Sequence, residues 1–396
     1  MDNRNPFRAG AGLPPPHLAG REEETEKFVA LLKQDGITTN LILTGLRGTG
    51  KTVLLDSWHP VAIKNNWLWV GTDLSESASV SETTIAIRIL TDLSIITSQL
   101  LIKKGQEPGF KGEGTQTPFD YNHILQLFND SPGLVSDRLK TTLQAVWQRL
   151  ETIPDIKGIV FAYDEAQFIN DQKKEKQYPL SVLLEVFQSL QKQNYPFLLV
   201  LAGLPTIQPR LSEARTYTER MFHVVELRSL NPEASRDAIL KPLQKQGSSV
   251  SFSQSSLELV ITASGGYPYF IQFICREAFD SFLAQMAYGH TTPTVPLKEI
   301  IAKLDIDFFA ARWQNTTDRE RELLSAIAEL SNSQSEFAIK EAEQKCKEIL
   351  KQPLKTGHIA QVLIKLADKG MVYRVRYGKY ALSIPMLNSF IKRQTI

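Results

Sequence analysis

The sequence predicts an α/β fold in which a doubly wound, parallel, five-stranded sheet is followed by an all-helical segment and a C-terminal winged-helix domain. Three observations support this prediction. A glycine-rich loop joins an early apolar strand to a helix, short apolar runs then alternate with helical patterns, and the chain ends in helices and a hairpin. The alternation favours a parallel sheet because parallel neighbours need a crossover connection, usually a helix.

Length and composition indicate a globular protein of several domains. At 396 residues, the chain is longer than one typical domain. We expect an extended lead-in over residues 1–20, a base domain over 21–229, a helical lid over 230–313 and the winged-helix domain over 314–396. Hydrophobic residues make up 42% and charged residues 22%, which is ordinary for a globular chain.

Charge and cysteine content restrict the partners and the compartment. The net charge of +2 is too small to indicate nucleic-acid binding by the whole chain, so any basic surface must be local. Cys275 and Cys346 show neither metal-ligand spacing nor a disulfide framework, which favours a reducing compartment. No apolar run approaches the roughly 18 residues of a membrane span, and residues 1–20 lack the apolar segment of a signal peptide. We therefore expect a cytoplasmic protein without a membrane partner.

The lead-in and the first helix have different patterns. Residues 1–16 are rich in Gly and Pro and end in Pro14-Pro15-Pro16, so we expect an extended segment that wraps the surface rather than packing into the core. A helix through Lys33 follows, with Phe28, Leu31 and Leu32 on one face.

The stretch 40–52 predicts a buried strand, a glycine loop and a helix start. Gly45, Gly50, Lys51 and Thr52 match the spacing G-x-x-x-x-G-K-[ST] of a phosphate-binding loop, or P-loop. Glycines let backbone N–H groups approach phosphates, Lys51 can reach the β- and γ-phosphates, and the Thr52 hydroxyl can ligate Mg²⁺. A glycine-rich turn with a chance lysine is the alternative, which the agreement of strand, loop and helix disfavours.

The P-loop therefore predicts a site for ATP or GTP with Mg²⁺, and we expect ATP. The residues expected to contact the nucleotide in this loop are Gly45, Arg47, Gly48, Thr49, Gly50, Lys51, Thr52 and Val53.

The next elements continue the alternation. We expect a strand over Trp67–Asp73 and a helix over Ser81–Lys103, whose core-facing stripe is Ile85, Ile89, Leu93, Ile96 and Leu100. The segment Lys104–Asp120 is rich in Gly, Pro, Gln and Thr, which predicts an exposed insertion or a disordered loop. A helix over about Ser136–Glu151 precedes the third strand.

The stretch Ile159–Glu165 predicts a buried strand that ends in two carboxylates. This is the pattern of a Walker B element, in which Asp164 belongs to the Mg²⁺ shell and Glu165 polarises the attacking water. The alternative is that both side chains merely cap the following turn. In the charged loop 171–176, a solvated face is favoured over a nucleic-acid contact.

A helix over Leu180–Gln193 precedes two further strands, Phe197–Gly203 and Phe222–Leu227. With the strands already placed, they complete a doubly wound parallel sheet.

The lid and the C-terminal segment are predicted from helical patterns. Helices are expected from Asn231, over Ser255–Ser264 and over Tyr267–Tyr288. After a helix start at Thr316, the expected elements are two helices, Glu336–Leu350 and Lys355–Lys369, and a hairpin with strands Met371–Arg376 and Tyr380–Ile384. This order of elements predicts a winged helix.

Several motifs together resemble AAA-type ATPases of the origin-recognition/archaeal-ATPase and transposition-regulator branch, bordering on STAND-type switch ATPases. They are Gly20-Arg21-Glu22, the P-loop, the Asp-Glu-Ala-Gln turn at 164–167, Glu-Arg-Met-Phe at 219–222 and Gly-Gly-Tyr-Pro at 265–268. The resemblance covers nearly the whole chain.

The resemblance implies roles for further residues. It places His17, Leu18 and Arg21 near the adenine, whereas a plain helix N-terminus is the alternative for this segment. It also implies a homo-oligomer in which Arg220 reaches the γ-phosphate in a neighbouring subunit. Arg215 is the competitor, and a local salt bridge for both arginines is the alternative.

Two departures from the family pattern favour a slow, partner-stimulated switch. The polar sensor residue that usually ends the fourth strand is missing, and the nearest hydroxyl belongs to Thr206. In the lid, Gly265-Gly266-Tyr267-Pro268 stands where many relatives have an arginine, which leaves Arg276 as a substitute.

The C-terminal charge suggests a partner. Between Lys355 and Ile396, eight basic residues face the single acid Asp368, and eight minus one leaves a net charge of +7. Such a stretch favours duplex DNA as a partner of the winged helix. A protein-docking module with a solvated basic face is the alternative.

These observations lead to two functional hypotheses. In the first, the protein is an ATP- and Mg²⁺-dependent ATPase switch that assembles into oligomers and contacts DNA. Its catalytic residues would be Lys51, Glu165 and Arg220. In the second, it is a STAND-like sensor or regulator in phage defence or mobile-element control, whose C-terminal domain binds a protein.

Overall fold

The computed structural model describes residues 3–10, 12–104, 119–332 and 335–394. The chain divides into two compact units. The sheet unit comprises Glu23–Thr44 and Leu54–Glu226, and the helical unit comprises Met1–Glu22, Gly45–Val53 and Leu227–Ile396.

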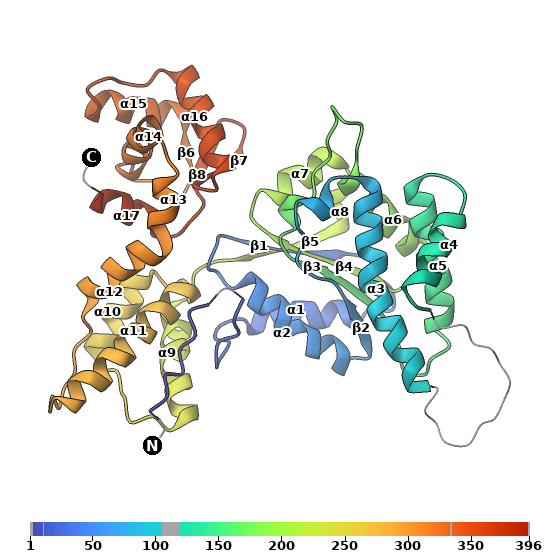
Figure 1. The fold of residues 1–396 in the computed structure, drawn as a ribbon, viewed down its shortest axis with the longest axis horizontal. Coiled ribbons are helices and arrows are strands. Elements are labelled where there is room, and N and C mark those ends of the chain that lie inside the picture. Colours follow the sequence, from blue (N-terminus) through green and yellow to red (C-terminus); the bar gives the residue numbers. More distant parts are fainter. Residues whose placement is uncertain (1–2, 11, 105–118, 333–334, 395–396) are drawn as a thin grey trace. The chain divides into compact units, whose positions relative to one another are not determined.

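The sheet confirms the predicted five-stranded α/β fold (Figure 1). Its strands are β1 (Asn40–Gly45), β2 (Trp67–Val70), β3 (Gly158–Tyr163), β4 (Phe197–Gly203) and β5 (Phe222–Leu227), in the order β2-β3-β4-β1-β5. The pairs β1–β4, β3–β4 and β2–β3 are parallel. The carboxyl ends of these strands therefore lie at one edge of the sheet, where α/β proteins bind ligands.

Helices cover both faces of the sheet, because successive side chains of a strand point to opposite sides. The helices on one face are α1 (Glu22–Leu32) and α2 (Lys51–Lys64), and those on the other include α3 (Glu82–Lys104), α5 (Val135–Leu150) and α6 (Pro179–Lys192). On the first face, Phe28 stacks on Trp58 with ring centroids 4.7 Å apart. On the second, Phe161 packs edge-on against Phe187 at 5.0 Å. This doubly wound arrangement agrees with the sequence prediction.

Parts of the sheet unit differ from the expected pattern. The predicted stripe of α3 is confirmed at Ile85, Ile89 and Leu93, which are fully buried, while the side chain of Leu100 lies outside the described residues. The expected exposed insertion falls mostly on 105–118, which also lie outside them. The short helices that the sequence did not indicate are α4 (Tyr121–Asp130), α7 (Ile207–Ala214), α8 (Thr218–Met221) and the 3₁₀ turns Ser77–Ser79 and Ala166–Phe168.

The helical unit contains the predicted lid helices. They are α9 (Pro232–Gln246), α10 (Gln254–Ser264), α11 (Pro268–Ala287), α12 (Leu297–Leu304), a π-helical turn (Asp305–Ala310) and α13 (Ala311–Gln314). The Asn231 side chain caps α9 by accepting a hydrogen bond from the Ala234 N–H at 2.8 Å. Gly247 and Gly265 end α9 and α10 in the left-handed conformation, which glycine adopts without a steric penalty.

The lead-in packs into the helical unit, so the prediction that it only wraps the surface was wrong. Phe7 is 3% exposed, and its ring meets those of Phe252 at 6.2 Å and Phe279 at 6.4 Å. Asn5 adds hydrogen bonds of its side-chain amide to the Arg276 carbonyl at 2.9 Å and to Asp280 at 2.8 Å. Burying one phenylalanine contributes about 1.5–3 kcal/mol toward holding this segment.

The C-terminal elements include the predicted helices and hairpin. They are α14 (Asp318–Ala328), β6 (Phe337–Ala338), α15 (Ile339–Ile349), α16 (Thr356–Asp368), β7 (Val372–Arg376), β8 (Lys379–Leu382) and α17 (Leu387–Arg393). The strands form an antiparallel sheet in the order β6-β8-β7. The sequence did not indicate β6 or α17, and the winged-helix assignment stays a prediction. Among the described residues, we find no helix with the length and apolarity needed to cross a membrane.

Candidate nucleotide site

The P-loop joins the end of β1 to the start of α2. Gly48 and Gly50 have φ angles of +81° and +90°, a left-handed backbone that side chains of L-residues rarely adopt. A Cβ atom on Gly50 would meet nothing within 4 Å, so the loop is open beside this residue. Because α2 begins directly at Lys51, the N–H groups of its first turn follow the loop. This backbone suits the binding of a phosphate group.

Lys51 supplies a positive charge beside the loop. Its ammonium group donates hydrogen bonds to the carbonyl oxygens of Gly45, at 2.9 Å, and Leu46, at 3.0 Å. The Thr49 hydroxyl also donates to the Leu46 carbonyl, at 2.8 Å. The side chain of Lys51 therefore lies along the P-loop, where a bound phosphate would need a charge partner.

Arg21, just after the lead-in, supports the P-loop. Its buried guanidinium donates to the carbonyl oxygens of Thr49, at 3.1 Å, and Arg228, at 2.8 Å. These bonds join the segment before α1, the P-loop and the segment after β5. They indicate a structural role for Arg21, and its predicted place near the adenine stays a prediction.

His17 and Leu18 lie just before Arg21 and are partly buried. Among the described residues, the buried Nε2 atom of His17 has no hydrogen-bond partner. Burial, and then the positive charges of Lys241 and Lys245, lower the pKa of His17 below its usual range. The imidazole is therefore neutral at pH 7 and can offer either a donor or an acceptor. Its predicted contact with the adenine stays a prediction.

One further arginine of the helical unit, Arg312, lies near the P-loop. The N–H of Tyr269, in α11, donates to the Gly48 carbonyl at 3.2 Å, and the Tyr269 ring contacts Phe308 at 5.0 Å. Arg312 lies over the ring of Phe308, with its guanidinium 5.0 Å from the ring centroid. Burial and the nearby positive charge of Arg47 lower the pKa of Arg312. Arg312 lies outside every sequence motif, so it could not be predicted from the sequence.

Arg276, the lid arginine that the sequence offered as a substitute, is engaged elsewhere. It forms an ion pair with Glu277 at 2.8 Å, and its guanidinium lies 5.3 Å from the ring centroid of Phe273. Thr206, the other proposed substitute, stands at the start of α7 and makes no capping hydrogen bond with its side chain.

In the sheet unit, Asp164 follows β3 at the carboxyl edge of the sheet. It is 3% exposed, and its Oδ1 atom accepts the N–H of Glu165 at 2.7 Å. Asp164 therefore does support the following turn, as the alternative interpretation held. Its backbone also bonds to the segment after β2, where the Leu74 N–H donates to the Asp164 carbonyl at 3.0 Å.

Two acidic residues that sequence analysis missed lie near Asp164. Partial burial, followed by the negative charges of Asp164 and Asp73, raises the pKa of Asp56. Partial burial and the charge of Asp164 raise that of Asp73. The sequence positions of both residues could have indicated that they lie near this site. Asp56 follows Thr52 by four residues in α2, a spacing that places two side chains on one helix face, and Asp73 is the last residue of the predicted strand Trp67–Asp73.

These carboxylates fit Mg²⁺ bound together with phosphates. Within the part of the chain that the structure describes, no group of three or more His, Cys, Asp or Glu side chains forms a ready-made metal site. Mg²⁺ usually takes one or two protein carboxylates, water and substrate phosphates rather than a complete protein cage. The excess of negative charge around Asp164 suits such an ion.

Glu165 is exposed at the turn after Asp164, with a left-handed backbone (φ 53°). Its carboxylate accepts a hydrogen bond from the side-chain amide of Gln167, whose oxygen accepts the Leu204 N–H at 2.9 Å. The guanidinium of Arg210 donates to the Gln167 carbonyl. The sequence predicted Glu165 but gave no role to Gln167 or Arg210.

Arg215 and Arg220, the two candidates for reaching the γ-phosphate of a neighbouring subunit, differ in their surroundings. Arg215 forms an ion pair with Glu185 at 3.1 Å. Arg220 is exposed on α8, and its side chain makes no hydrogen bond or ion pair with any residue that the structure describes. Arg220 is therefore the better candidate for an intermolecular contact.

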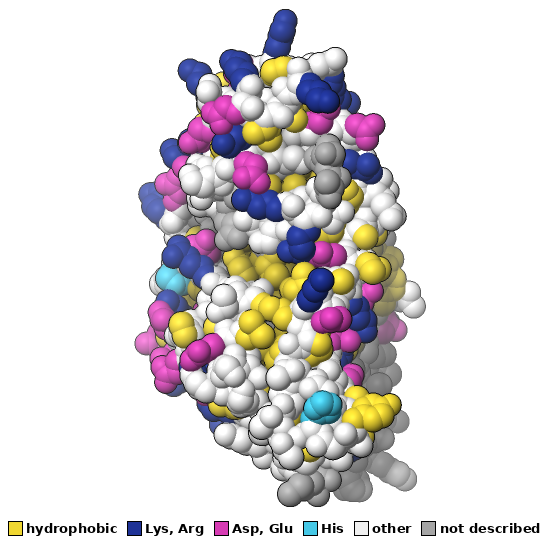
Figure 2. All heavy atoms as spheres, turned by 90° about the vertical axis from the view of Figure 1, so that its left-hand side faces the viewer, with side chains coloured by type: hydrophobic (Ala, Val, Ile, Leu, Met, Phe, Trp, Pro, Cys, Tyr) yellow, Lys and Arg dark blue, Asp and Glu magenta, His cyan; other side chains and the backbone are white. Residues whose placement is uncertain are grey.

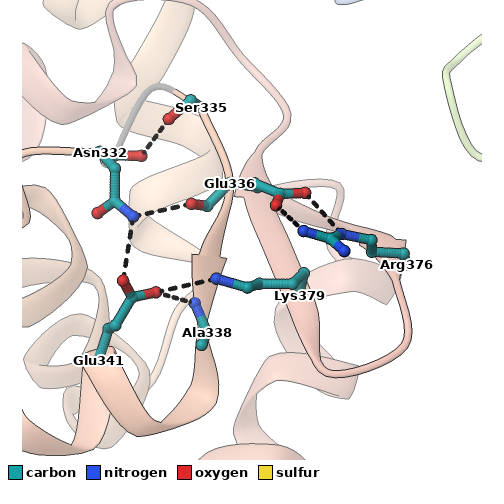
Figure 3. Close-up of polar contacts among 7 residues, drawn as sticks. All are labelled: Asn332, Ser335, Glu336, Ala338, Glu341, Arg376 and Lys379. Atoms are coloured by element: carbon teal, nitrogen blue, oxygen red, sulfur yellow. Dashed lines mark hydrogen bonds and ion pairs between the residues drawn. The ribbon is translucent and has the colours of Figure 1, made fainter.

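Much of the positive charge at the C-terminus is neutralised locally. Figure 2 shows Lys and Arg side chains interspersed with Asp and Glu on the face toward the viewer. In Figure 3, Arg376 points toward Glu336 and Lys379 toward Glu341, and the second pair is 3.4 Å apart. The other pairs are Lys369–Glu320 at 2.6 Å, Lys392–Glu329 at 3.5 Å and Arg393–Asp305 at 2.6 Å.

The charge of +7 therefore overstates the basic surface. All five acidic partners precede Lys355, so a count that starts at this residue omits them. Lys355 and Lys365 are exposed and have no ion-pair partner among the described residues. Arg374 lies over the ring of Tyr377, at 5.2 Å from its centroid. These three side chains are the ones with charge left for a phosphate backbone.

Comparisons with known proteins agree with the fold. The Walker-type ATPase PABY2304 of Pyrococcus abyssi is 15% identical with a TM-score of 0.61, over 95% of this chain and 96% of that one. The ORC2 protein of Aeropyrum pernix in its ADP form is 14% identical with a TM-score of 0.54, over 97% of each chain. The chain shares the fold of these ATPases.

Two further comparisons concern the C-terminal region and the fold. Cdc6p of Pyrobaculum aerophilum is 17% identical with a TM-score of 0.50, over 97% of this chain and 96% of that one. A family model described as a domain of unknown function (DUF8462) matches residues 306–391, which include most of the predicted winged-helix domain. No curated protein matches the chain.

Proposed function

We propose that this protein is an ATP-binding, Mg²⁺-dependent ATPase that works as a molecular switch. The observation that carries the proposal is the P-loop, with left-handed Gly48 and Gly50 and the Lys51 ammonium along its carbonyl groups. The fold likeness to a Walker-type ATPase and to ORC2 in its ADP form supports it. The protein would bind ATP and release ADP and phosphate.

Each residue of the site then has a task. Bound Mg²⁺ would neutralise charge on the phosphates. The P-loop N–H groups and Lys51 bind the phosphates, and Thr52 and Asp164 supply metal ligands. Glu165 orients the attacking water and accepts its proton. The parallel register of β1, β4 and β3 supports this division of tasks, because the strands before the P-loop and before Asp164 end at the same edge of the sheet.

The switch would work as a homo-oligomer in which Arg220 completes the site of a neighbouring subunit. The side chain of Arg220 is exposed and has no hydrogen-bond or ion-pair partner among the described residues, which supports this proposal. The side chain of Arg215 is occupied by its ion pair with Glu185. An arginine supplied by a neighbour stabilises charge that develops on the transferred phosphoryl group.

Duplex DNA is the partner that we propose for the C-terminal domain, through Lys355, Lys365 and Arg374. These side chains retain charge after the local ion pairs are formed, and phosphates attract such charge at low salt. A protein partner, as in a STAND-like regulator, is the alternative outcome of the DNA-binding measurement below.

Replacing Lys51 with alanine should weaken ATP binding by about 10- to 100-fold, because a charged hydrogen-bond donor to the phosphates is lost. Titration calorimetry with ATP and Mg²⁺ measures this affinity. Lys64→Ala, at the exposed far end of the same helix, is the control and should bind normally. Tight ATP binding by Lys51→Ala would contradict the proposed phosphate site.

Neutralising Lys355, Lys365 and Arg374 should lower the slope of log affinity for DNA against log salt by about 0.9 per lost phosphate contact. Fluorescence anisotropy with a labelled duplex at several salt concentrations measures the slope. Lys347→Ala is the matched control, because Lys347 is exposed but paired with Glu343 at 3.0 Å. If the unmodified protein shows no salt-dependent DNA binding, the protein-partner alternative stands.

A further inference from the structure

The last residues of β4 carry no polar side chain. The side chain of Gln167 lies against this end of the strand instead. The strand finishes in Ala202-Gly203, followed by Leu204 and Pro205. Gln167 is 7% exposed, and its side-chain oxygen accepts the Leu204 N–H at 2.9 Å. A Cβ atom on Gly203 would lie 2.6 Å from this oxygen. Gly203 therefore leaves the space that the amide of Gln167 occupies.

The chemistry of the amide fixes its orientation. A backbone N–H can only donate, so the atom of Gln167 that faces Leu204 must be the oxygen. The amide nitrogen consequently points the other way, and there it donates to the carboxylate of Glu165. Rotating the amide by half a turn would break both bonds. The amide NH₂ would then face the N–H of Leu204, a donor against a donor, and the amide oxygen would face the carboxylate of Glu165, an acceptor against an acceptor.

The backbone of Gln167 is also held. The guanidinium of Arg210, in α7, donates to the Gln167 carbonyl. Burial lowers the pKa of Arg210. The side chain of Gln167 thus extends from a fixed point between the turn after β3 and the end of β4.

We propose that Gln167 is a positioning residue that holds the carboxylate of Glu165 in one orientation for hydrolysis, with Gly203 providing the space. The inference rests on the proposed ATPase function. Glu165 is exposed and carries a long side chain, so without a donor it would populate several rotamers. A misplaced base lowers the rate, because a small error in geometry at the reacting atoms can cost about 100-fold.

The first test is Gln167→Met, which keeps the length of the side chain but removes both hydrogen bonds. We expect kcat for ATP to fall by about 10- to 100-fold, while the Kd for ATP changes by less than about threefold. Unchanged kcat in Gln167→Met, with an active unmodified protein, would overturn the inference. If the unmodified protein does not hydrolyse ATP at all, the proposed function fails first and takes the inference with it.

A double-mutant cycle separates positioning from a general structural effect. If Gln167 acts through Glu165, adding Gln167→Met to Glu165→Gln should lower the residual single-turnover rate by less than about twofold. Gln167→Met could instead lower the rate as much in the Glu165→Gln protein as in the protein with Glu165 intact. Gln167 would then act through some other group, and the inference would be overturned.

The steric part of the inference has its own test, which also serves if Gln167→Met does not fold. Gly203→Ala should lower kcat about as much as Gln167→Met, because the new methyl group displaces the amide. In a Gln167→Ala background, the same methyl should cause less than about a twofold further loss, because the side-chain oxygen at 2.6 Å is gone and the nearest remaining atoms are the backbone nitrogens of Gln167, at 3.3 Å, and Ala166, at 3.5 Å. Gly357→Ala, at a position with no atom within 4 Å of the added Cβ, controls for glycine replacement. Equal losses from Gly203→Ala with and without the Gln167 side chain would contradict the proposed space-sharing.

Discussion

Replacing Glu165 with glutamine is expected to slow ATP hydrolysis by about 10²- to 10⁴-fold and to leave ATP bound. The amide is nearly isosteric with the carboxylate, but it cannot accept the proton of the attacking water. The contacts assigned to ATP binding come from the P-loop and Lys51, so this variant keeps them. Steady-state phosphate release and ATP titration measure the two properties separately.

The matched control for this variant is Glu175→Gln, which removes an exposed carboxylate from the charged loop 171–176 of the same unit. It should hydrolyse ATP at the unmodified rate. Undiminished hydrolysis by Glu165→Gln would show that another group activates the water. Gln167 would then also have no catalytic carboxylate to orient.

Replacing Arg220 with alanine should lower ATP hydrolysis by about 10³-fold or more if the side chain completes a neighbour's site, since trans arginines commonly contribute that much. ATP affinity should stay the same, because the variant keeps its own P-loop. Arg215→Ala is the comparison, and it should lose far less because Arg215 is paired with Glu185. If Arg220→Ala hydrolyses ATP at the unmodified rate, the arginine that completes the neighbour's site is Arg215, or the protein uses no such arginine.

Mixing variants tests the trans geometry directly. Lys51→Ala and Arg220→Ala should each be inactive alone. In a mixed oligomer, an intact P-loop of one subunit can meet an intact Arg220 of the other, so part of the activity should return. Native mass spectrometry must first show that mixed oligomers form. Mixed oligomers without recovered hydrolysis would exclude Arg220 as the trans residue.

The fold was predictable because its signals lie in consecutive residues. Apolar runs mark β1, β3 and β4, and the glycine spacing marks the P-loop between β1 and α2. The two-residue strand β6 carries too few residues for a pattern, and α17 is only seven residues long. Both are set by tertiary packing rather than by local preference.

The parts of the site that were missed depend on distant residues. Gln167 meets Leu204, which lies 37 positions further along the chain, and Arg210 meets the carbonyl of Gln167 across 43 positions. The C-terminal charge was misjudged for a similar reason, because Arg376 is paired with Glu336, 40 positions before it. Sequence spacing predicts which chemistry is present, but the pairing of charges and amides becomes visible only in three dimensions.

The burial of Phe7 has a consequence for the order of folding during synthesis. The sheet unit is complete once residue 226 has been made, whereas Phe7 must wait for Phe252 and Phe279. At about 5–20 residues per second, this aromatic side chain leaves the ribosome roughly 12 to 55 s before its partners. Throughout that interval, Phe7 lacks these two aromatic partners. The core around Phe7 is therefore completed only after all residues of the sheet unit have been made.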